Sequence, residues 1–412
     1  MKFRTHTLDN GLQIVAECND EAHSTAVGFF VKAGSRDETD AVAGVSHFLE
    51  HMTFKGTPTR SADDVNREFD EIGAQYNAFT NEENTVYYAA VLPEYLDRAV
   101  ELLADILRPS LREEDFDTEK KVIIEEIRMY DDQPPFGADE QCKAVYYGSH
   151  PLGRSVLGTV QSITDLSVDA MRDYFHRRYS PDNIVLACAG RIDFDALIAS
   201  VSRCCDPWQR VEHSRIVEPA LPHVAFERRQ KEISTQQYAL QLAHGPAARD
   251  DDRFAAKLLA TVLGDDSGSR LYWELIDTGL AEHASTSHCE YEGAGLMMTY
   301  MSCEPESTAD NLQRILDVYR GAETDGITPE ELQQAKNKIR SRIVLSSERP
   351  RGRLFVVGID WMYRDEYRSV DDDLQTVAAV TVDEIHAMLA KYPLSRNTTM
   401  TIGPIEEIAA PK

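Results

Sequence analysis

Two long helical patterns, one in each half of the chain, resemble each other, and this repeat constrains the fold most. The stretch REEDFDTEKKVIIEEIR aligns with TPEELQQAKNKIRSRIV when Phe116 is placed on Leu332 and Ile127 on Ile343. A second correspondence links STAVGFFVKAG with STQQYALQLAHG. Because 412 residues exceed the size of one ordinary hydrophobic core, the repeat predicts two structurally related domains that arose by internal duplication.

The segment from Gln209 to Glu227 separates the two similar halves. It is polar, contains two prolines and shows little hydrophobic periodicity, which is typical of a linker. We therefore predict an N-terminal domain, residues 1–215, and a homologous C-terminal domain, residues 216–412.

Strand and helix patterns are mixed in the first half. Apolar positions at steps of three and four predict a helix from Ala41 to about Lys55, and Ser61 begins a second helix with a capping box. The stretches YNAFT and NTVYYAAV predict an antiparallel strand pair, and a long helix ends at Pro134. This order predicts an α+β fold in which each domain is a mostly antiparallel sheet packed with helices.

The composition excludes several classes of protein. A formal net charge of -27 opposes binding to phosphate backbones, so no nucleic-acid partner is expected. The N-terminus does not resemble a signal peptide, and no run of 18 apolar residues indicates a membrane span, so we expect a cytoplasmic protein without a membrane partner. Seven cysteines without a CxxC pair argue against a thiolate metal site.

The motif HFLEH carries the strongest chemical signal. On the predicted helix, His47 and His51 lie one turn apart on the same face, so both imidazoles can reach one ion. Glu50 lies beside them, where its carboxylate can accept a proton from water. A pair of ordinary surface or core histidines is the alternative interpretation.

A catalytic zinc usually has three protein ligands, so a third residue is needed. In the long helix, Glu119 and Glu126 lie two turns apart in an otherwise apolar stretch, where a buried carboxylate needs a partner. We assign Glu126 to the metal and Glu119 to the orientation of a ligand histidine, although an exposed helix face would explain both. The repeat places Ala335 and Arg342 at the corresponding positions, so the C-terminal domain is expected to be non-catalytic.

These residues resemble the inverted zinc motif of the pitrilysin, insulysin and mitochondrial processing peptidase family. HFLEH and the glutamate of EKKVIIEEI carry the motif, and the surrounding GSRDE, EHMTFKGT and GAQYNAFTNEENTVYY fit the family, except that Asn84 replaces its more usual histidine. In the second half, GSRLYWELIDTGLAEH resembles the family's stretch after its central helix. The resemblance implies one zinc ion per chain, in the N-terminal domain. It also implies that a peptide joins YNAFT as an added edge strand, with Asn77 and Ala78 as backbone contacts, although Asn77 could equally be a turn residue.

The expected function is that of a zinc metalloendopeptidase, with Glu50 as general base. Peptides or unfolded segments would be cleaved in a chamber that a second chain completes, in a homodimer or a heterodimer with a related chain. Two alternatives stay open: a catalytically silent structural or regulatory subunit of a peptidase complex, and a dedicated maturation protease for one precursor peptide.

Overall fold

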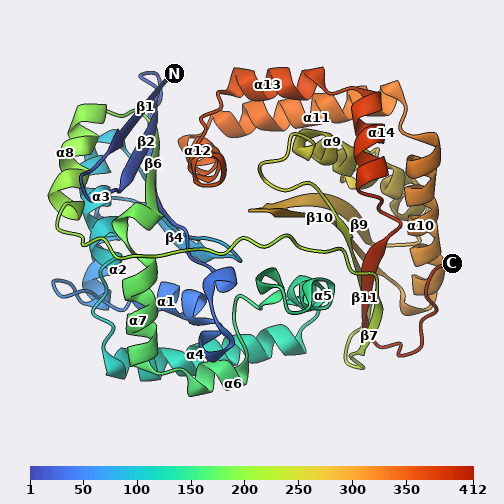
Figure 1. Ribbon diagram of the computed structural model, residues 1–412, viewed down its shortest axis with the longest axis horizontal. Helices are drawn as coiled ribbons and strands as arrows, with labels where there is room; N and C mark the ends of the chain where they lie inside the picture. Colours follow the sequence, from blue (N-terminus) through green and yellow to red (C-terminus); the bar gives the residue numbers. More distant parts are fainter. The chain divides into compact units, whose positions relative to one another are not determined.

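Each half of the chain builds one mostly antiparallel sheet, and the two sheets share a topology (Figure 1). The computed structural model describes residues 1–412. The first sheet has the strand order β1-β2-β6-β3-β5-β4 and the second β7-β11-β8-β10-β9. The strands are β1 Lys2–Thr7, β2 Gln13–Cys18, β3 Thr25–Val31, β4 Gln75–Thr80, β5 Thr85–Val91, β6 Ile184–Gly190, β7 Phe226–Gln230, β8 Gln237–His244, β9 His283–Tyr291, β10 Ala294–Cys303 and β11 Asn397–Gly403.

The shared topology confirms the predicted α+β duplication. Within their own halves, the series β2 to β6 and β7 to β11 both follow the order first, fifth, second, fourth, third. In both, the first and fifth strands form the parallel pair and the other neighbours are antiparallel. Strand β1 is an addition at one edge of the first sheet, and β4 is its other edge.

Fourteen α-helices accompany the sheets. They are α1 Val45–Thr53, α2 Ala62–Glu71, α3 Leu96–Ile106, α4 Glu113–Asp132, α5 Ala138–Tyr147, α6 Val160–Asp165, α7 Val168–Arg178, α8 Phe194–Cys205, α9 Arg253–Gly264, α10 Thr308–Asp325, α11 Pro329–Ser347, α12 Pro350–Arg364, α13 Val370–Ala379 and α14 Val382–Lys391. The predicted cap of α2 is confirmed, because Ser61 and Asp64 form a capping box. No helix is both long and apolar enough to cross a lipid bilayer.

The two compact units of the chain exchange segments. One unit comprises residues 1–128, 154–216 and 345–368, and the other comprises 129–153, 217–344 and 369–412. The predicted domains, residues 1–215 and 216–412, are contiguous and therefore contain no such exchange. It brings α12 onto the first sheet and α5 onto the second, so each sheet has one apolar face covered by a helix from the other half of the sequence.

Buried side chains explain why α12 packs with the first unit. Leu354 and Val357 of α12 join a core cluster with Phe30, Val185 and other residues of the first sheet. The helix backbone approaches the sheet closely at Gly358, where a Cβ atom would lie 2.4 Å from the Phe30 ring. A larger residue at this position would push α12 away from the sheet.

A buried ion pair also attaches α12 to this sheet. The guanidinium of Arg353 donates to both carboxylate oxygens of Glu17 at 2.5 to 3.1 Å, and the Tyr367 hydroxyl donates to the same carboxylate at 2.9 Å. Arg353 and Glu17 are 3% and 2% exposed, so neither charge has water as an alternative partner.

We expect Arg353→Met to lower the free energy of unfolding by about 3 to 5 kcal/mol, because it leaves the Glu17 carboxylate buried without its cation. Urea unfolding of wild type and variant measures this difference. The matched control is Arg314→Met, which breaks the half-exposed pair with Glu274 and should cost under about 1 kcal/mol. Equal losses in the two variants would contradict the account.

The helix that carries the histidine motif begins later than its apolar pattern predicts. Residues 40–42 form a short 3-10 turn, and α1 starts at Val45. The reason is Gly44, whose φ of 89° lies in the left-handed region. A Cβ atom there would lie 2.5 Å from the Leu157 carbonyl oxygen, so both the conformation and the close approach require glycine.

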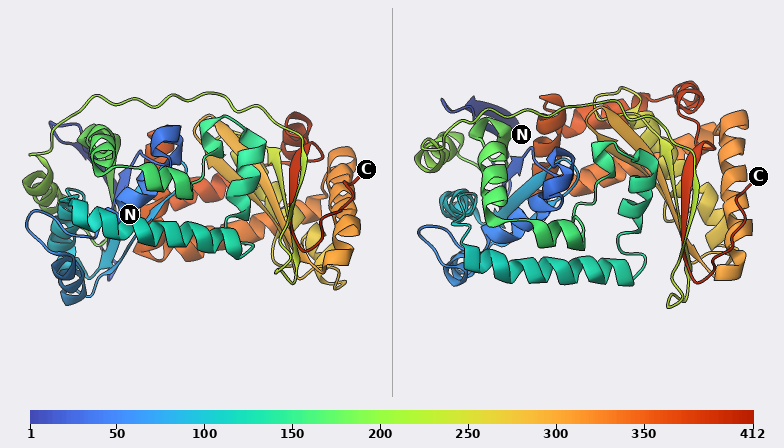
Figure 2. Two further views of the ribbon diagram at one scale, coloured as in Figure 1. Left: turned by 90° about the horizontal axis from the view of Figure 1, so that it is seen from below. Right: turned by 60° about the horizontal axis from the view of Figure 1, so that its bottom comes forward.

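The predicted linker, Gln209 to Glu227, lacks regular structure except for its last two residues, which begin β7. Residues 208–225 contain no helix or strand and form a long extended trace in Figure 2. The long helix α4 is continuous in the same views and ends ahead of Pro134 and Pro135, as the sequence predicts.

Candidate metal centre

Two histidines of α1 share one face of the helix. Val45, Phe48, Leu49 and Met52 are buried in the core, which fixes the rotation of α1 about its axis. His47 and His51 are four residues apart, and their ring centroids are 4.7 Å from each other. The apolar periodicity of the motif therefore sets the direction of both imidazoles.

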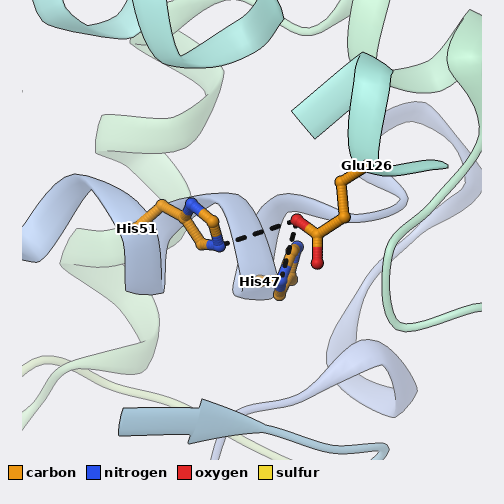
Figure 3. A group of neighbouring side chains, drawn as sticks. All are labelled: His47, His51 and Glu126. Carbon is orange, nitrogen blue, oxygen red and sulfur yellow. Dashed lines mark ion pairs between the residues drawn. The ribbon is translucent and has the colours of Figure 1, made fainter. Parts of the chain in front are cut away.

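Glu126 of α4 brings a carboxylate to these imidazoles (Figure 3). Its Oε2 atom lies 3.8 Å from Nε2 of His47 and 3.8 Å from Nε2 of His51. One ligand atom from each of the three residues lies within 4.8 Å of the others. Figure 3 shows the three side chains pointing toward a common centre.

The donor set fits a zinc ion. Two imidazole nitrogens and one carboxylate oxygen are the ligands of a common class of catalytic zinc site, which leaves one position open. Ligand atoms about 2.0 to 2.1 Å from a tetrahedral ion lie about 3.3 Å apart. The carboxylate–imidazole pairs are 3.8 Å apart and all ligand atoms lie within 4.8 Å, so each pair must close by about 0.5 to at most about 1.5 Å, which side-chain rotation can supply.

The pKa values of the two histidines shift in opposite directions. Burial, and then the neighbouring His51, lower the pKa of His47 to about 3, so its imidazole is neutral at neutral pH. Burial also acts to lower the pKa of His51, but its hydrogen bond with Glu119 and the charge of Glu126 outweigh burial and raise it. Burial raises the pKa of Glu126, and His51 opposes this. A bound cation would favour the neutral imidazoles and the ionised carboxylate.

Glu119 lies one step further from the centre and holds His51. Its Oε1 atom is 2.9 Å from Nδ1 of His51, and its Oε2 atom is 2.6 Å from the ammonium of Lys55. Burial acts to raise the pKa of Glu119, but the hydrogen bonds with His51 and Lys55 prevail and lower it. The carboxylate therefore stays ionised and leaves Nε2 of His51 directed at the centre.

We expect Glu119→Gln to weaken zinc binding by roughly 10- to 100-fold, because His51 loses the carboxylate that orients it and raises its basicity. Competition with a chromophoric chelator measures the affinity. Glu114→Gln, an exposed position on the same helix, is the control and should bind zinc like wild type. Equal affinities of the Glu119 and Glu114 variants would contradict this role of Glu119.

Glu50 lies on α1 between the two histidines, with its carboxylate held by strand β4. The Thr80 hydroxyl donates a hydrogen bond to its Oε2 atom at 2.6 Å. Burial raises the pKa of Glu50, and the Thr80 hydrogen bond partly counteracts this effect. A half-buried carboxylate with a raised pKa beside a candidate metal centre has the properties of a general base.

Asn77 and Ala78 lie in β4, the edge strand that contacts α1. Asn77 is exposed, and its side-chain oxygen accepts the N–H of Ala78 at 2.9 Å. Asn77 is therefore a strand residue in this structure and not a turn residue. The free edge of β4 has the geometry to accept an added strand.

Two contributors were not expected from the sequence. Thr80 has no recognisable signal, because its contact with Glu50 joins a strand to a helix 30 residues away. Lys55 could have been recognised from the sequence. It follows His51 by four residues, and the long helix predicted to supply Glu119 and Glu126 had to lie near His51.

Comparisons with known proteins show which protein family this chain resembles. The family described as Insulinase (Peptidase family M16) matches residues 13–160, and the Peptidase M16 inactive domain matches residues 165–339. A protein named as an uncharacterized zinc protease of Mycobacterium tuberculosis (strain H37Rv) is 36% identical over 417 residues, which cover 97% of this chain and 93% of the relative. Bacillus subtilis YmxG, named in the same way, is 32% identical over 389 residues and 94% of each chain.

Solved structures share the fold. A protease from Helicobacter pylori superposes with a TM-score of 0.92 at 22% identity, covering 98% of this chain and 99% of that one. A structure titled peptidase M16 inactive domain, from Pseudomonas fluorescens, gives 0.91 at 18% identity over the whole of both chains. The chain belongs to peptidase family M16, the insulinase family, which confirms the resemblance seen in its motifs.

Proposed function

We propose that this chain is a zinc-dependent endopeptidase that binds one zinc ion through His47, His51 and Glu126. The observation that carries the proposal is the convergence of these three ligand atoms within 4.8 Å, with the Glu50 carboxylate on the same helix as the histidines. Relatives named zinc proteases support the metal and the reaction class.

When bound, zinc would supply Lewis-acid polarisation of the scissile carbonyl and of the attacking water. Glu50 removes the proton from that water and passes it to the leaving amine. Thr80 keeps the carboxylate of Glu50 in one orientation through its hydrogen bond. Burial, which raises the pKa of Glu50, makes its carboxylate a better proton acceptor than an exposed glutamate.

The substrates we propose are peptides or unfolded segments that add to the free edge of β4. The backbone of Asn77 and Ala78 would pair with the substrate strand, and the Asn77 side chain, which holds the Ala78 N–H in this structure, would have to release it.

A second chain, identical or related, would complete the chamber around the substrate. Native mass spectrometry tests this part, and an active monomer would contradict it. A cytoplasmic location is also part of the proposal, and cell fractionation tests it.

The experiment that tests the reaction is hydrolysis of a quenched fluorescent peptide library by purified wild type, before and after treatment with 1,10-phenanthroline. We expect cleavage that the chelator abolishes and added zinc restores. Cleavage that survives complete removal of metal would overturn the proposal. Zinc-loaded protein without any cleavage would instead favour the catalytically silent subunit, and cleavage confined to one sequence would favour the maturation protease.

A further inference from the structure

Glu38 is a buried carboxylate outside the metal centre. It follows the 3-10 turn Ser35–Asp37 and is 3% exposed. No lysine, arginine or histidine forms an ion pair with it. Burial raises the pKa of Glu38 to about 7, against the effect of hydrogen bonds from Ser46 and Gly44. A carboxylate in such a position is costly to bury and needs a role that explains it.

The structure shows what this carboxylate binds. Its Oε2 atom accepts the backbone N–H of Gly44 and its Oε1 atom accepts the backbone N–H of Ser46, both at 2.7 Å. Gly44 is the N-cap of α1 and has no side chain to cap the helix, and the first turn of α1 contains no acidic residue. Glu38 therefore supplies the cap, and its carboxyl group lies at the positive end of the helix dipole.

A second contact fixes the same turn. The hydroxyl of Ser46 lies 2.6 Å from the hydroxyl of Tyr174 on α7, and both side chains are buried. Ser46 directly precedes His47. The backbone that carries His47 is thus held by Glu38 on one side and by α7 on the other.

The two histidines differ in what orients them. The ring of His51 is held through Nδ1 by Glu119, whereas Nδ1 of His47 is buried and has no hydrogen-bond partner. The direction of His47 must therefore come from its backbone and its packing. His47 is the third residue of α1, so loosening of the first turn would move it and leave His51, one turn further along, in place.

We propose that Glu38 is a positioning residue for the metal centre: by capping the first turn of α1 it holds His47, as Glu119 holds His51. This inference rests on the proposed zinc centre. Glu38 bonds to the backbone N–H groups of Gly44 and Ser46 and not to His47, His51 or Glu126, so it acts through the helix backbone.

The test compares Glu38→Gln with wild type. The amide has the same length, but it can accept only one N–H, and its own NH2 group faces the other donor. We expect zinc affinity, measured by chelator competition, to fall by roughly tenfold or more. In the cobalt-substituted protein the visible absorption bands should shift. In the zinc-loaded enzyme kcat should fall while KM stays within about twofold.

The matched control is Glu323→Gln, in the other unit of the chain. Like Glu38, Glu323 accepts a backbone N–H through its carboxylate. It receives this bond and a hydroxyl hydrogen bond from Ser395, both at 2.7 Å. Glu323→Gln should lower the melting temperature without changing zinc affinity or the cobalt spectrum. Wild-type zinc affinity and cobalt spectrum in folded Glu38→Gln would overturn the inference. If Glu38→Gln does not fold, Glu38→Asp tests the inference instead. We expect Glu38→Asp to bind zinc more weakly than wild type, and a wild-type zinc affinity would contradict the inference.

The zinc readout separates the two proposals. A wild type that binds zinc but hydrolyses no peptide would contradict the proposed function, while the affinities of the Glu38 variants would still test the positioning role.

Discussion

Glu50→Gln is expected to lower kcat by about 10² to 10⁴ while the protein still binds zinc like wild type. The amide cannot accept the proton of the attacking water, yet it keeps the size of the side chain and can still accept the hydrogen bond from Thr80. Hydrolysis of the peptide library and zinc analysis of the same samples measure the two quantities.

Glu71→Gln is the control for this variant, because Glu71 is an exposed residue at the end of α2 in the same unit. It should be as active as wild type. A Glu50→Gln enzyme with unchanged kcat would remove Glu50 from the reaction, and loss of zinc from it would show that Glu50 acts on the metal site instead.

Glu126→Ala is expected to lose zinc and with it the activity. Removing an oriented outer partner of a zinc ligand typically costs 10- to 100-fold in affinity, and removing a ligand itself should cost at least about a hundredfold. The site would then retain only the two imidazoles of α1. Zinc content after dialysis against a weak chelator, followed by the peptide assay, measures both effects.

The neighbouring residue offers a close control. Glu125 lies on the same helix but is exposed and paired with Arg128, so Glu125→Ala should keep zinc and activity. If Glu125→Ala lost zinc as Glu126→Ala does, the effect would belong to the helix and not to the Glu126 carboxylate. Retention of zinc by Glu126→Ala would exclude Glu126 as a ligand.

Much of the fold could be predicted because local patterns agree with it. The capping box at Ser61, the prolines after α4 and the strand pair β4 and β5 are all encoded by residues close in sequence. The exchange of α5 and α12 could not be predicted this way. Which sheet an apolar helix covers depends on packing against residues such as Phe30 and Val185, which lie far away in the chain.

The same distinction between local and long-range contacts applies to the candidate site. His47, Glu50 and His51 are recognisable because helix periodicity alone puts them on one turn, and Glu126 follows once a third ligand is required. The contacts that hold these residues were not recognisable. Thr80 reaches Glu50 from a strand, and Glu38 reaches the first turn of α1 from a loop, so neither contact has a fixed sequence spacing.

The most direct test of the zinc centre is X-ray absorption at the zinc edge of the purified wild-type chain. We expect one zinc per chain, with two imidazole nitrogens and oxygen ligands at about 2.0 to 2.2 Å. A protein without zinc after purification and zinc addition, or a zinc bound by sulfur at about 2.3 Å, would contradict the centre formed by His47, His51 and Glu126.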